Sequence, residues 1–291
     1  MHRKGLGWRQ TGESCQEAER QKANSVNVKS EVPVVILCGG MGTRLREETE
    51  YRPKPLVEIG GRPVLWHIMK IYGSQGFKRF VLCLGYKGDM IRQYFLNYRL
   101  MTRNFTLQLD GDMEPMVESN GAPEGWTITF ADTGTNAMTG ARIKRISHYV
   151  EADEFMLTYG DGVANIDLLE LLKFHRNHGR LATVTAVHPI ARFGELMIEG
   201  SRVVRFAEKS QVPEGYINGG FFVFNKGIFD YLSEDDGCVL EREPLERLAS
   251  EGQLMTYHHA GFWHCMDTYR DLQVLNQFWE SPNPPWKMWK S

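Results

Sequence analysis

A run of apolar residues that ends in glycines constrains the fold of this chain more than any other stretch. Residues Val34 to Cys38 are all apolar, and Gly39, Gly40 and Gly42 follow directly. Such a run predicts a buried strand of a parallel sheet followed by a tight loop. Because glycine places no Cβ in the way of a ligand, successive N–H groups of the loop can point at an anion. The stretch therefore predicts a phosphate-binding loop, with a simple strand-to-loop turn as the alternative.

The residues after the glycines suit an anion but match neither of two common phosphate loops. Thr43 supplies a hydroxyl donor, and Arg44 supplies a permanently charged fork that matches phosphate oxygens. A Walker-type loop requires Lys-Ser or Lys-Thr after its last glycine, and neither pair stands at that spacing. A dinucleotide fingerprint reads Gly-x-Gly-x-x-Gly, whereas the order here is Gly-Gly-x-Gly-Thr-Arg. Both motifs are therefore excluded.

Composition limits the partners of the chain. Of its 291 residues, 42% are hydrophobic and 24% are charged, as in an ordinary globular protein. The formal net charge of -2 argues against general binding to nucleic acid or acidic membranes, so a phosphate site must be local. No apolar run approaches the roughly 18 residues that cross a bilayer. The five cysteines are scattered, as expected of reduced thiols in a cytoplasmic protein.

The remaining pattern alternates strands with helices. Helices are expected over 63–72, 89–98, 139–150 and 167–177, and strands over 80–84, 126–131, 154–159 and 181–188. This order predicts an α/β fold with a doubly wound, mostly parallel, Rossmann-like mixed sheet flanked by helices, whose ligands gather at the carboxyl ends of the strands. Strands over 192–198 and 203–209 are expected to form a small antiparallel part that folds over the site. Residues 1–30 are polar and aperiodic, and predict a disordered extension.

Three charged residues stand where a ligand would meet them. Lys54 lies between Pro53 and Pro55, and each proline restricts the backbone, so its ammonium is held on a stiff arm. Asp161 follows an apolar strand between two glycines, and Asp267 is a second isolated carboxylate. Carboxylates at strand ends suit Mg²⁺, which takes one or two of them together with substrate phosphates. The alternatives are a solvated lysine on a linker and an aspartate that caps a helix.

Two helices carry further polar candidates. Thr139 is placed to cap the helix that follows it, and Arg142 would point from its first turn toward a bound anion. His175 and His178 are three positions apart on the next helix. Since no third metal ligand lies near them in the sequence, we expect both histidines at the surface.

The glycine loop and the proline-clamped lysine together resemble the sugar-phosphate nucleotidylyltransferases over about residues 33–290. Gly39-Gly40-Met41-Gly42-Thr43-Arg44-Leu45 is similar to the nucleotide-binding signature of that family, and Pro53-Lys54-Pro55 follows it. Other stretches are most similar to the branch that makes CDP-glucose and pyrophosphate from CTP and α-D-glucose 1-phosphate: Glu47-Glu48-Thr49, Leu65-Trp66-His67-Ile68-Met69-Lys70, Tyr159-Gly160-Asp161-Gly162-Val163, Ile217-Asn218-Gly219-Gly220-Phe221-Phe222 and Met266-Asp267-Thr268. Cys38, Arg52 and Ser210 depart from the family pattern, in which alanine, lysine and proline are common.

The resemblance implies a role for each residue. Arg44 and Lys54 would be catalytic, and Asp161 and Asp267 would hold Mg²⁺. The nucleotide would contact Leu37, Gly39, Gly40, Met41, Gly42, Thr43, Arg44, Lys54, Thr133, Thr139, Arg142 and Gly160. The sugar phosphate would contact Tyr159, Glu208, Lys209, Asn218 and Gly219. Residues 31–291 would form one domain, with a nucleotide-binding part over about 31–165 and a sugar-phosphate-binding and C-terminal part over about 166–291.

Substrate choice and assembly stay open at this point. A sister enzyme that uses UTP, dTTP or GTP, or another sugar 1-phosphate, would carry the same motifs, since base choice rests on a few hydrogen bonds. A nucleotide-sugar-binding regulator without catalysis is the alternative from another class. The resemblance implies a homo-oligomer, a hexamer by family precedent. Subunit contacts would involve the stretch 101–126 or the C-terminal tryptophans, Trp279, Trp286 and Trp289, unless these are apolar staples within one chain.

Overall fold

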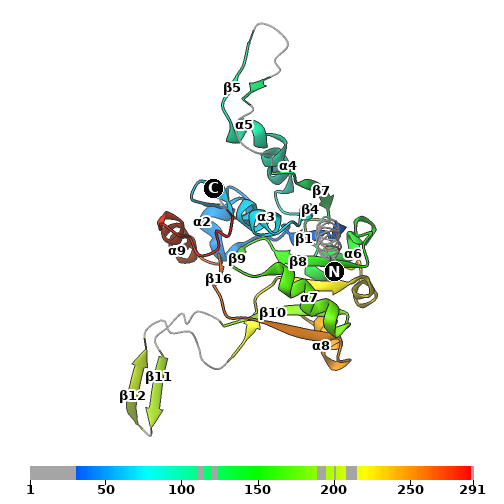
Figure 1. Ribbon diagram of the computed structural model, residues 1–291, viewed down its shortest axis with the longest axis vertical. Helices are drawn as coiled ribbons and strands as arrows, with labels where there is room; N and C mark the ends of the chain where they lie inside the picture. The colour runs from blue at the N-terminus through cyan, green and yellow to red at the C-terminus, as the bar shows by residue number, and fades with distance from the viewer. Residues whose placement is uncertain are drawn as a thin grey trace, which may run out of the picture.

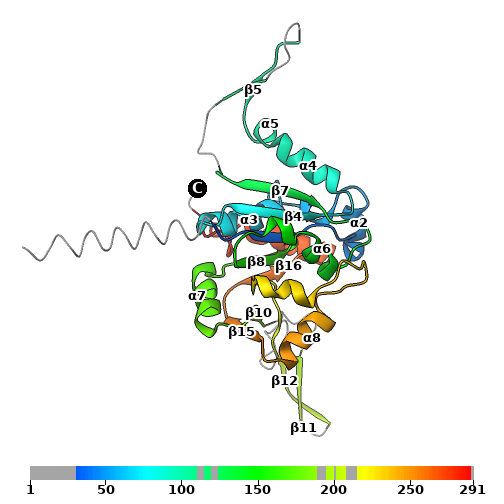
Figure 2. The ribbon, with the colours of Figure 1, turned by 90° about the vertical axis from the view of Figure 1, so that its right-hand side faces the viewer.

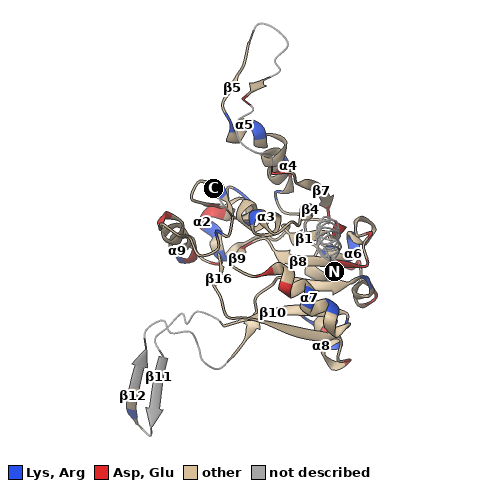
Figure 3. Cartoon of the chain, in the orientation of Figure 1, with Lys and Arg blue, Asp and Glu red and all other residues tan. Residues whose placement is uncertain are grey.

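The computed structural model describes residues 31–109, 115–118, 124–188, 195–199, 201–207 and 215–289. Residues 1–30 lie outside this range, so the extension expected there stays a prediction. The described chain is built around one mixed sheet with helices on both faces (Figures 1 and 2). Acidic and basic positions are interspersed along its elements, in keeping with the small net charge (Figure 3). The four cysteines in the described range, Cys38, Cys83, Cys238 and Cys265, are free thiols.

Eight strands form the central sheet: β1 (Val34–Leu37), β4 (Arg79–Leu84), β7 (Thr127–Asp132), β8 (Glu154–Tyr159), β10 (Ala182–Val187), β13 (Ile217–Asn218), β14 (Phe222–Asn225) and β15 (Leu254–His259). Their order is β13-β10-β14-β8-β1-β4-β7, and β15 pairs with β10. β1 runs parallel to β4 and β8, whereas β14 is antiparallel to β8 and β10. The predicted mixed, mostly parallel sheet is therefore confirmed.

Helices cover both faces because the strands are apolar on both sides. In β1, Val34 and Ile36 belong to one core, and Val35 and Leu37 to the other, as the two-residue period of a strand requires. The first core includes residues of α3 (Val64–Ser74), α4 (Gly88–Leu96), α7 (Leu168–His178) and α9 (Tyr269–Glu280). The second includes residues of α6 (Thr139–Arg145), the 3-10 helix η4 (Lys226–Tyr231) and α8 (Glu243–Ser250). This is the doubly wound architecture that the sequence predicts.

The carboxyl ends of β1 and β8 meet where the chain changes its direction across the sheet. From β1 the chain moves outward through β4 to β7, and it then returns to β8 on the other side of β1. Leu37 at the end of β1 pairs with Tyr159 at the end of β8. Ligands of open α/β sheets bind at such a switch point, in the crevice outside the strand ends. The glycine loop follows the end of β1, and Asp161 follows the end of β8, so both lie at this switch point.

Short elements surround the central sheet. The antiparallel pairs are β2 (Glu58–Ile59) with β3 (Arg62–Pro63), β5 (Phe105–Thr106) with β6 (Met116–Val117), and β9 (Gly162–Ala164) with β16 (Trp263–Cys265). The short helices are η1 (Thr43–Leu45), α2 (Arg46–Thr49), η2 (Lys54–Leu56), α5 (Tyr98–Thr102) and η3 (Ser147–Tyr149). Because Gly162 of β9 pairs with Cys265 of β16, this ladder brings Asp161 and Asp267 together.

Two extensions leave the body of the molecule (Figures 1 and 2). One continues from the C-terminal end of α4 through α5 and the β5–β6 pair, and the hairpin of β11 (Glu195–Glu199) and β12 (Arg202–Ala207) forms the other. The sequence predicts the β11–β12 pair, and the structure confirms that it forms a two-stranded sheet of its own. The segments that join this hairpin to the sheet lie outside the described residues, so the expectation that it folds over the site stays a prediction. Among the described residues, no helix is long and apolar enough to span a bilayer.

The C-terminal tryptophans pack within the chain around His67 of α3. The rings of Trp279, Trp286 and Trp289 lie 4.6, 5.9 and 6.4 Å from the His67 ring. His67 Nε2 lies 2.9 Å from the carbonyl oxygen of Ile59, which requires an N–H at that nitrogen. Nδ1 is therefore the acceptor for the indole N–H of Trp286, at 3.3 Å. The three tryptophans therefore pack as a staple within the chain, and a part for them in subunit contacts stays a prediction.

The surface position expected for His175 is wrong. Its residue is 1% exposed, Nδ1 lies 2.8 Å from Thr183 Oγ1, and Nε2 lies 3.2 Å from Asn225 Oδ1. His178 Nε2 lies 2.7 Å from the same Thr183 hydroxyl. α7 thus docks on β10 and β14 partly through polar contacts, which helical periodicity does not reveal.

We expect His67 to make the free energy of unfolding depend on pH. Burial lowers the pKa of His67 from 6.5 to about 4, so the folded chain keeps the ring neutral where the unfolded chain protonates it. The stabilisation is present above pH 6.5 and falls by about 3 kcal/mol as the pH drops toward 4. Denaturant unfolding of the wild type and of His67→Gln across this range measures the effect, with exposed His148→Gln as control. Equal pH slopes for the wild type and His67→Gln would contradict it.

Candidate active site

The glycine loop leaves β1 and is open to solvent. Gly40, Met41 and Thr43 are exposed. Gly42 has a φ of 63°, a left-handed conformation that favours glycine, and a Cβ there would come 2.7 Å from Thr49 Cγ2. The Thr49 hydroxyl shares its proton between the carbonyls of Gly42 and Leu45, at 3.1 and 3.0 Å, and so holds the turn. Within the described residues, the amides of Gly40, Met41 and Gly42 donate to no protein acceptor, so the loop offers open N–H donors.

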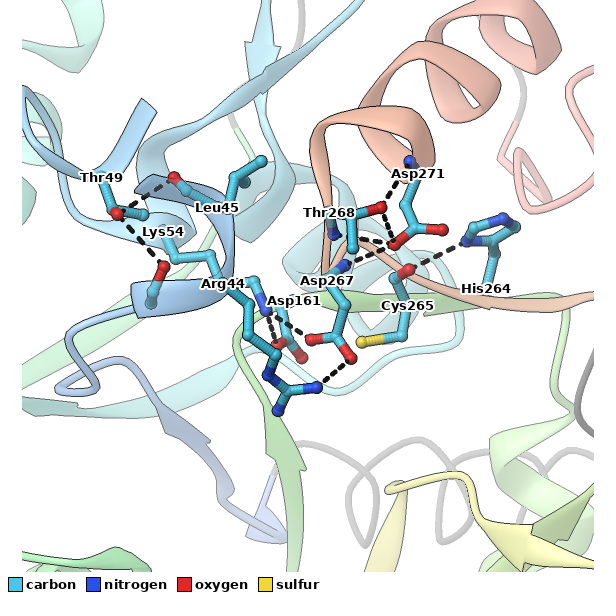
Figure 4. A network of polar contacts seen from close by, with 11 residues as sticks. Arg44, Leu45, Thr49, Lys54, Asp161, His264, Cys265, Asp267, Thr268 and Asp271 are labelled. Carbon is cyan, nitrogen blue, oxygen red and sulfur yellow. Dashed lines mark hydrogen bonds and ion pairs between the residues drawn. The ribbon is translucent and has the colours of Figure 1, made fainter. Parts of the chain in front are cut away.

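Lys54 lies between the two carboxylates that the sequence singles out (Figure 4). Its Nζ is 2.6 Å from Asp161 Oδ2 and 2.9 Å from Asp267 Oδ1. The other oxygen of Asp267 accepts a hydrogen bond from Arg44 at 2.7 Å. The side chains of Lys54, Asp161 and Asp267 are 12, 23 and 16% exposed, whereas that of Arg44 is 72% exposed. The fold therefore gathers all four charged candidates into one network.

Local structure holds both sides of this network. Pro53 is extended, with φ -67° and ψ 146°, and Lys54 opens η2 directly after it. On the other side, Thr268 caps α9 in a capping box with Asp271. The Asp271 carboxylate accepts the backbone N–H groups of Asp267 and Thr268 at 3.1 and 2.8 Å. The backbone next to Lys54 and Asp267 is thus ordered by its neighbours in the sequence.

The charges of this network shift one another's pKa values. Burial by itself lowers the pKa of Lys54, but Asp161 and Asp267 outweigh burial and raise it above 10.5. Burial by itself raises the pKa of Asp267, but Lys54 and Arg44 outweigh burial and lower it below 3.8. Burial, followed by the neighbouring carboxylates, raises the pKa of the Cys265 thiol. At neutral pH, Lys54 and Asp267 are therefore charged and Cys265 is a neutral thiol.

The donor set fits a divalent cation. Asp161, Cys265 and Asp267 each bring a potential ligand atom within 4.8 Å of the others. The Lys54 ammonium bridges the two carboxylates, which shows that they converge on a single positive charge. Hard cations prefer carboxylate oxygens to a neutral thiol. Asp161 and Asp267 are thus the residues of this site that can hold a metal ion.

Arg142 fastens the glycine loop to the sheet. Its residue is 4% exposed, and its guanidinium donates to the carbonyls of Gly39, Leu84 and Gly134 at 3.0, 3.0 and 2.7 Å, and to the Thr133 hydroxyl at 2.8 Å. A Cβ at Gly39 would come 2.1 Å from Arg142 Nη1, so the contact requires glycine. The expected orientation of Arg142 toward an anion is therefore not found, and its contact with a nucleotide stays a prediction.

The candidates for the two substrates meet at a carboxylate, Glu241. Thr139 does not cap α6 as expected, because Met138 is the N-cap residue, and the Thr139 hydroxyl instead donates to Glu241 Oε2 at 2.6 Å. The Tyr159 hydroxyl donates to Glu241 Oε1 at 2.5 Å. Asn218 Nδ2 in turn donates to the Tyr159 hydroxyl at 3.1 Å. One carboxylate thus joins a residue predicted for the nucleotide to two predicted for the sugar phosphate.

Of the other predicted contact residues, some lie within the described residues and some outside them. Gly160 lies where β1 and β8 end, and a Cβ there would come 2.8 Å from the carbonyl oxygen of Leu37. Gly219 follows β13 and is buried. Glu208 and Lys209 lie outside the described residues. The substrate contacts assigned to all of these residues stay predictions.

Sequence reasoning missed Asp271, Cys265 and Glu241. Asp271 carries a signal, because Thr268-x-x-Asp271 has the spacing of a capping box before a helix. Cys265 carries no such signal, because a single cysteine in a sequence does not indicate which residues lie near it in the folded chain. Glu241 is 82 positions from Tyr159 and 102 from Thr139, so only the folded chain places it between them.

Comparison with known proteins identifies the family. The model of the nucleotidyl transferase family matches residues 33–280, a range that holds the glycine loop, Lys54, Asp161 and Asp267. The chain belongs to this family and is a nucleotidyltransferase. It is 48% identical over 257 residues to the glucose-1-phosphate cytidylyltransferase of Salmonella typhi, which covers 88% of this chain and 99% of that protein. It is 30% identical over 217 residues to the D-glycero-alpha-D-manno-heptose 1-phosphate guanylyltransferase of Aneurinibacillus thermoaerophilus, covering 73 and 83%.

Solved structures share the architecture. HddC from Yersinia pseudotuberculosis superposes with a TM-score of 0.62 at 24% identity, over 86% of this chain and all of that one (100%). The inositol-1-phosphate CTP transferase from T. maritima superposes with a TM-score of 0.58 at 16% identity, over 87 and 98%. At these identities the likeness concerns the fold, and it agrees with the sheet described above.

We expect Arg142→Lys to destabilise the chain and loosen the glycine loop. A lysine ammonium has three donors and no planar fork, so buried carbonyls that Arg142 now satisfies would lose their partners, at about 1–3 kcal/mol each. Denaturant unfolding should therefore show a loss of about 2 kcal/mol or more. The control is Arg247→Lys, which changes an exposed pair with Glu251 and a stacking contact with the Tyr231 ring. Equal stability of Arg142→Lys and the wild type would show that these contacts do not hold the loop.

Proposed function

We propose that this chain is a glucose-1-phosphate cytidylyltransferase, which converts CTP and α-D-glucose 1-phosphate into CDP-glucose and pyrophosphate. The 48% identity to the Salmonella typhi enzyme, over 99% of its length, supports this pair of substrates over those of the 30% identical guanylyltransferase. The observation that carries the proposal is the convergence of Arg44, Lys54, Asp161 and Asp267 beside a glycine loop. Two phosphate-bearing substrates and a metal ion need this combination of charges.

The proposed reaction is an in-line displacement. An oxygen of glucose 1-phosphate forms a bond to the α-phosphorus of CTP, and the bond from that phosphorus to the bridging oxygen of pyrophosphate breaks. Because the attacking oxygen is already ionised, the protein needs no general base and acts by positioning and by neutralising charge. The open amides of the glycine loop and the Arg44 guanidinium would bind the triphosphate, and Arg44 would stabilise the charge on the leaving pyrophosphate. Lys54 would bridge the two reacting phosphates.

Asp161 and Asp267 would hold Mg²⁺ in this scheme. When bound, Mg²⁺ neutralises charge on the triphosphate. In the structure the two carboxylates bind Lys54 instead. Since the carboxylates would then have the metal ion as their partner, the Lys54 ammonium becomes available to the phosphates. Lys54 would therefore pair with the two carboxylates when no substrate is bound, and with the phosphates when the substrates and the metal ion are bound.

One assay tests the substrate assignment. Pyrophosphate release is measured with CTP, UTP, dTTP and GTP, each against a panel of hexose and heptose 1-phosphates in the presence of Mg²⁺. We expect CTP with glucose 1-phosphate to give the highest kcat/KM. A higher value for another pair would identify a sister nucleotidyltransferase. Release with no pair would favour a nucleotide-sugar-binding regulator.

Lys54→Ala should lower turnover by about a hundredfold or more, in line with the loss of one group that stabilises charge in the transition state. The fold should persist, which circular dichroism checks. Lys173→Ala is the matched control, because Lys173 is an exposed lysine that pairs only with Glu170 on the same helix among the described residues. Pyrophosphate release by Lys54→Ala at the rate of the control would remove Lys54 from the mechanism.

Asp267→Asn should abolish Mg²⁺-dependent activity. The amide keeps the size of the side chain but lacks the charge that attracts a hard cation, and it leaves Lys54 with one carboxylate. The measurement is a titration of activity against Mg²⁺ concentration for the wild type and the variant. An unchanged titration would exclude Asp267 as a ligand.

We also propose that the chain forms a homo-oligomer, a hexamer by resemblance to its family, in the cytoplasm. The extension of α4, α5 and β5–β6 supports an assembly, because Leu96, Met101, Leu109 and Met116 expose 80, 62, 79 and 62% of their surface there. Sedimentation equilibrium measures the mass in solution. A particle of 33.4 kDa, the mass of a single chain, would rule out the assembly.

A further inference from the structure

We propose that Glu241 is a positioning residue that couples the nucleotide and sugar-phosphate sides of the active site. The proposal rests on the proposed function and extends that function by assigning a role to a residue that no sequence motif marks. Glu241 touches no reacting group in this scheme. It acts through Thr139 and Tyr159, which both donate hydrogen bonds to its carboxylate, at 2.6 and 2.5 Å.

The chemical nature of the groups around Glu241 determines which of them donates and which accepts each hydrogen bond. The Thr139 hydroxyl accepts from the backbone N–H of Leu240 at 2.9 Å, and its own proton goes to Glu241 Oε2. The Tyr159 hydroxyl accepts from the Asn218 amide at 3.1 Å, and its proton goes to Glu241 Oε1. A carboxylate accepts on both oxygens, whereas a glutamine amide accepts only on one. The arrangement therefore requires a carboxylate at this position.

The segment that carries Glu241 is anchored on α6 and cannot shift freely. The backbone N–H groups of Met138 and Ala141 donate to the carbonyls of Asp236 and Cys238 at 2.9 and 3.1 Å. A Cβ at Gly140 would come 2.6 Å from Cys238 Sγ, so this close approach depends on glycine. Glu241 is consequently placed by α6, while Tyr159 is placed by β8.

Charge argues for positioning rather than for direct binding of phosphate. Both substrates are anions, and a carboxylate that faced their phosphates would repel them. Glu241 instead directs its two oxygens at hydroxyl groups of the protein. Tyr159 lies two residues before Asp161 and pairs in register with Leu37, so its orientation bears directly on the strand ends where the substrates would meet. Holding the Tyr159 ring and the Thr139 side chain together keeps the two subsites in one alignment.

The experiment compares Glu241→Gln with three other variants in steady-state kinetics. Tyr159→Phe and Thr139→Val each remove one of the two donors, and Glu246→Gln is the control because it changes an exposed carboxylate of α8 close to Glu241 in the sequence. The wild type is assayed first with the full substrate panel, and the variants are then assayed with the pair that it prefers. Failure of the substrate assignment is thereby separated from failure of the role of Glu241.

Glu241→Gln should raise the KM of both substrates by about tenfold, with kcat changed less than threefold and an unchanged melting temperature. Tyr159→Phe should raise mainly the KM of the sugar phosphate, and Thr139→Val mainly that of the nucleotide. In a double-mutant cycle, Glu241→Gln with Tyr159→Phe should cost less in kcat/KM than the product of the two single effects. Unchanged KM values for Glu241→Gln, or effects that simply multiply, would overturn the proposal.

Discussion

The ion bridge from Lys54 to Asp161 and Asp267 is the interaction on which the rest of the site depends. It joins the segment after the glycine loop, which carries Lys54, to the end of β8 and to the start of α9. Asp161 and Asp267 lie 107 and 213 positions from Lys54 in the chain. A largely buried ammonium between two carboxylates is satisfied only while all three elements keep their places. The same three groups carry the charges that the proposed phosphate transfer requires, so the contact that closes the site would also supply its chemistry.

The sheet makes this convergence possible. β1 and β8 run parallel and end side by side at the switch point, and both therefore deliver their following loops to one edge. The β9–β16 ladder then adds the segment of Asp267 to the same place. Around this centre, buried polar contacts hold the loops: Arg142 binds the carbonyl of Gly39, and Asp271 binds the backbone of Asp267. These residues organise the backbone beside the charged groups.

Much of the fold and part of the site followed from local patterns. The apolar run before Gly39, the proline-clamped Lys54 and the isolated Asp161 and Asp267 are each recognisable within about ten residues, and the structure brings them together. Predictions that depended on what a side chain meets in space were less successful. Arg142 turned inward, and His175 is buried.

The sequence by itself determined which chemical groups the candidate site contains, because backbone freedom at glycine, stiffness at proline and charge at lysine and aspartate are properties of the residues alone. Only the tertiary structure decided which partners those residues have. Glu241 shows the difference most clearly, since its partners Tyr159 and Thr139 lie 82 and 102 positions away. Such contacts arise from the packing of α6 and β8 around a common sheet. The physical reason is that hydrogen bonds act over about 3 Å in space and carry no signature along the chain.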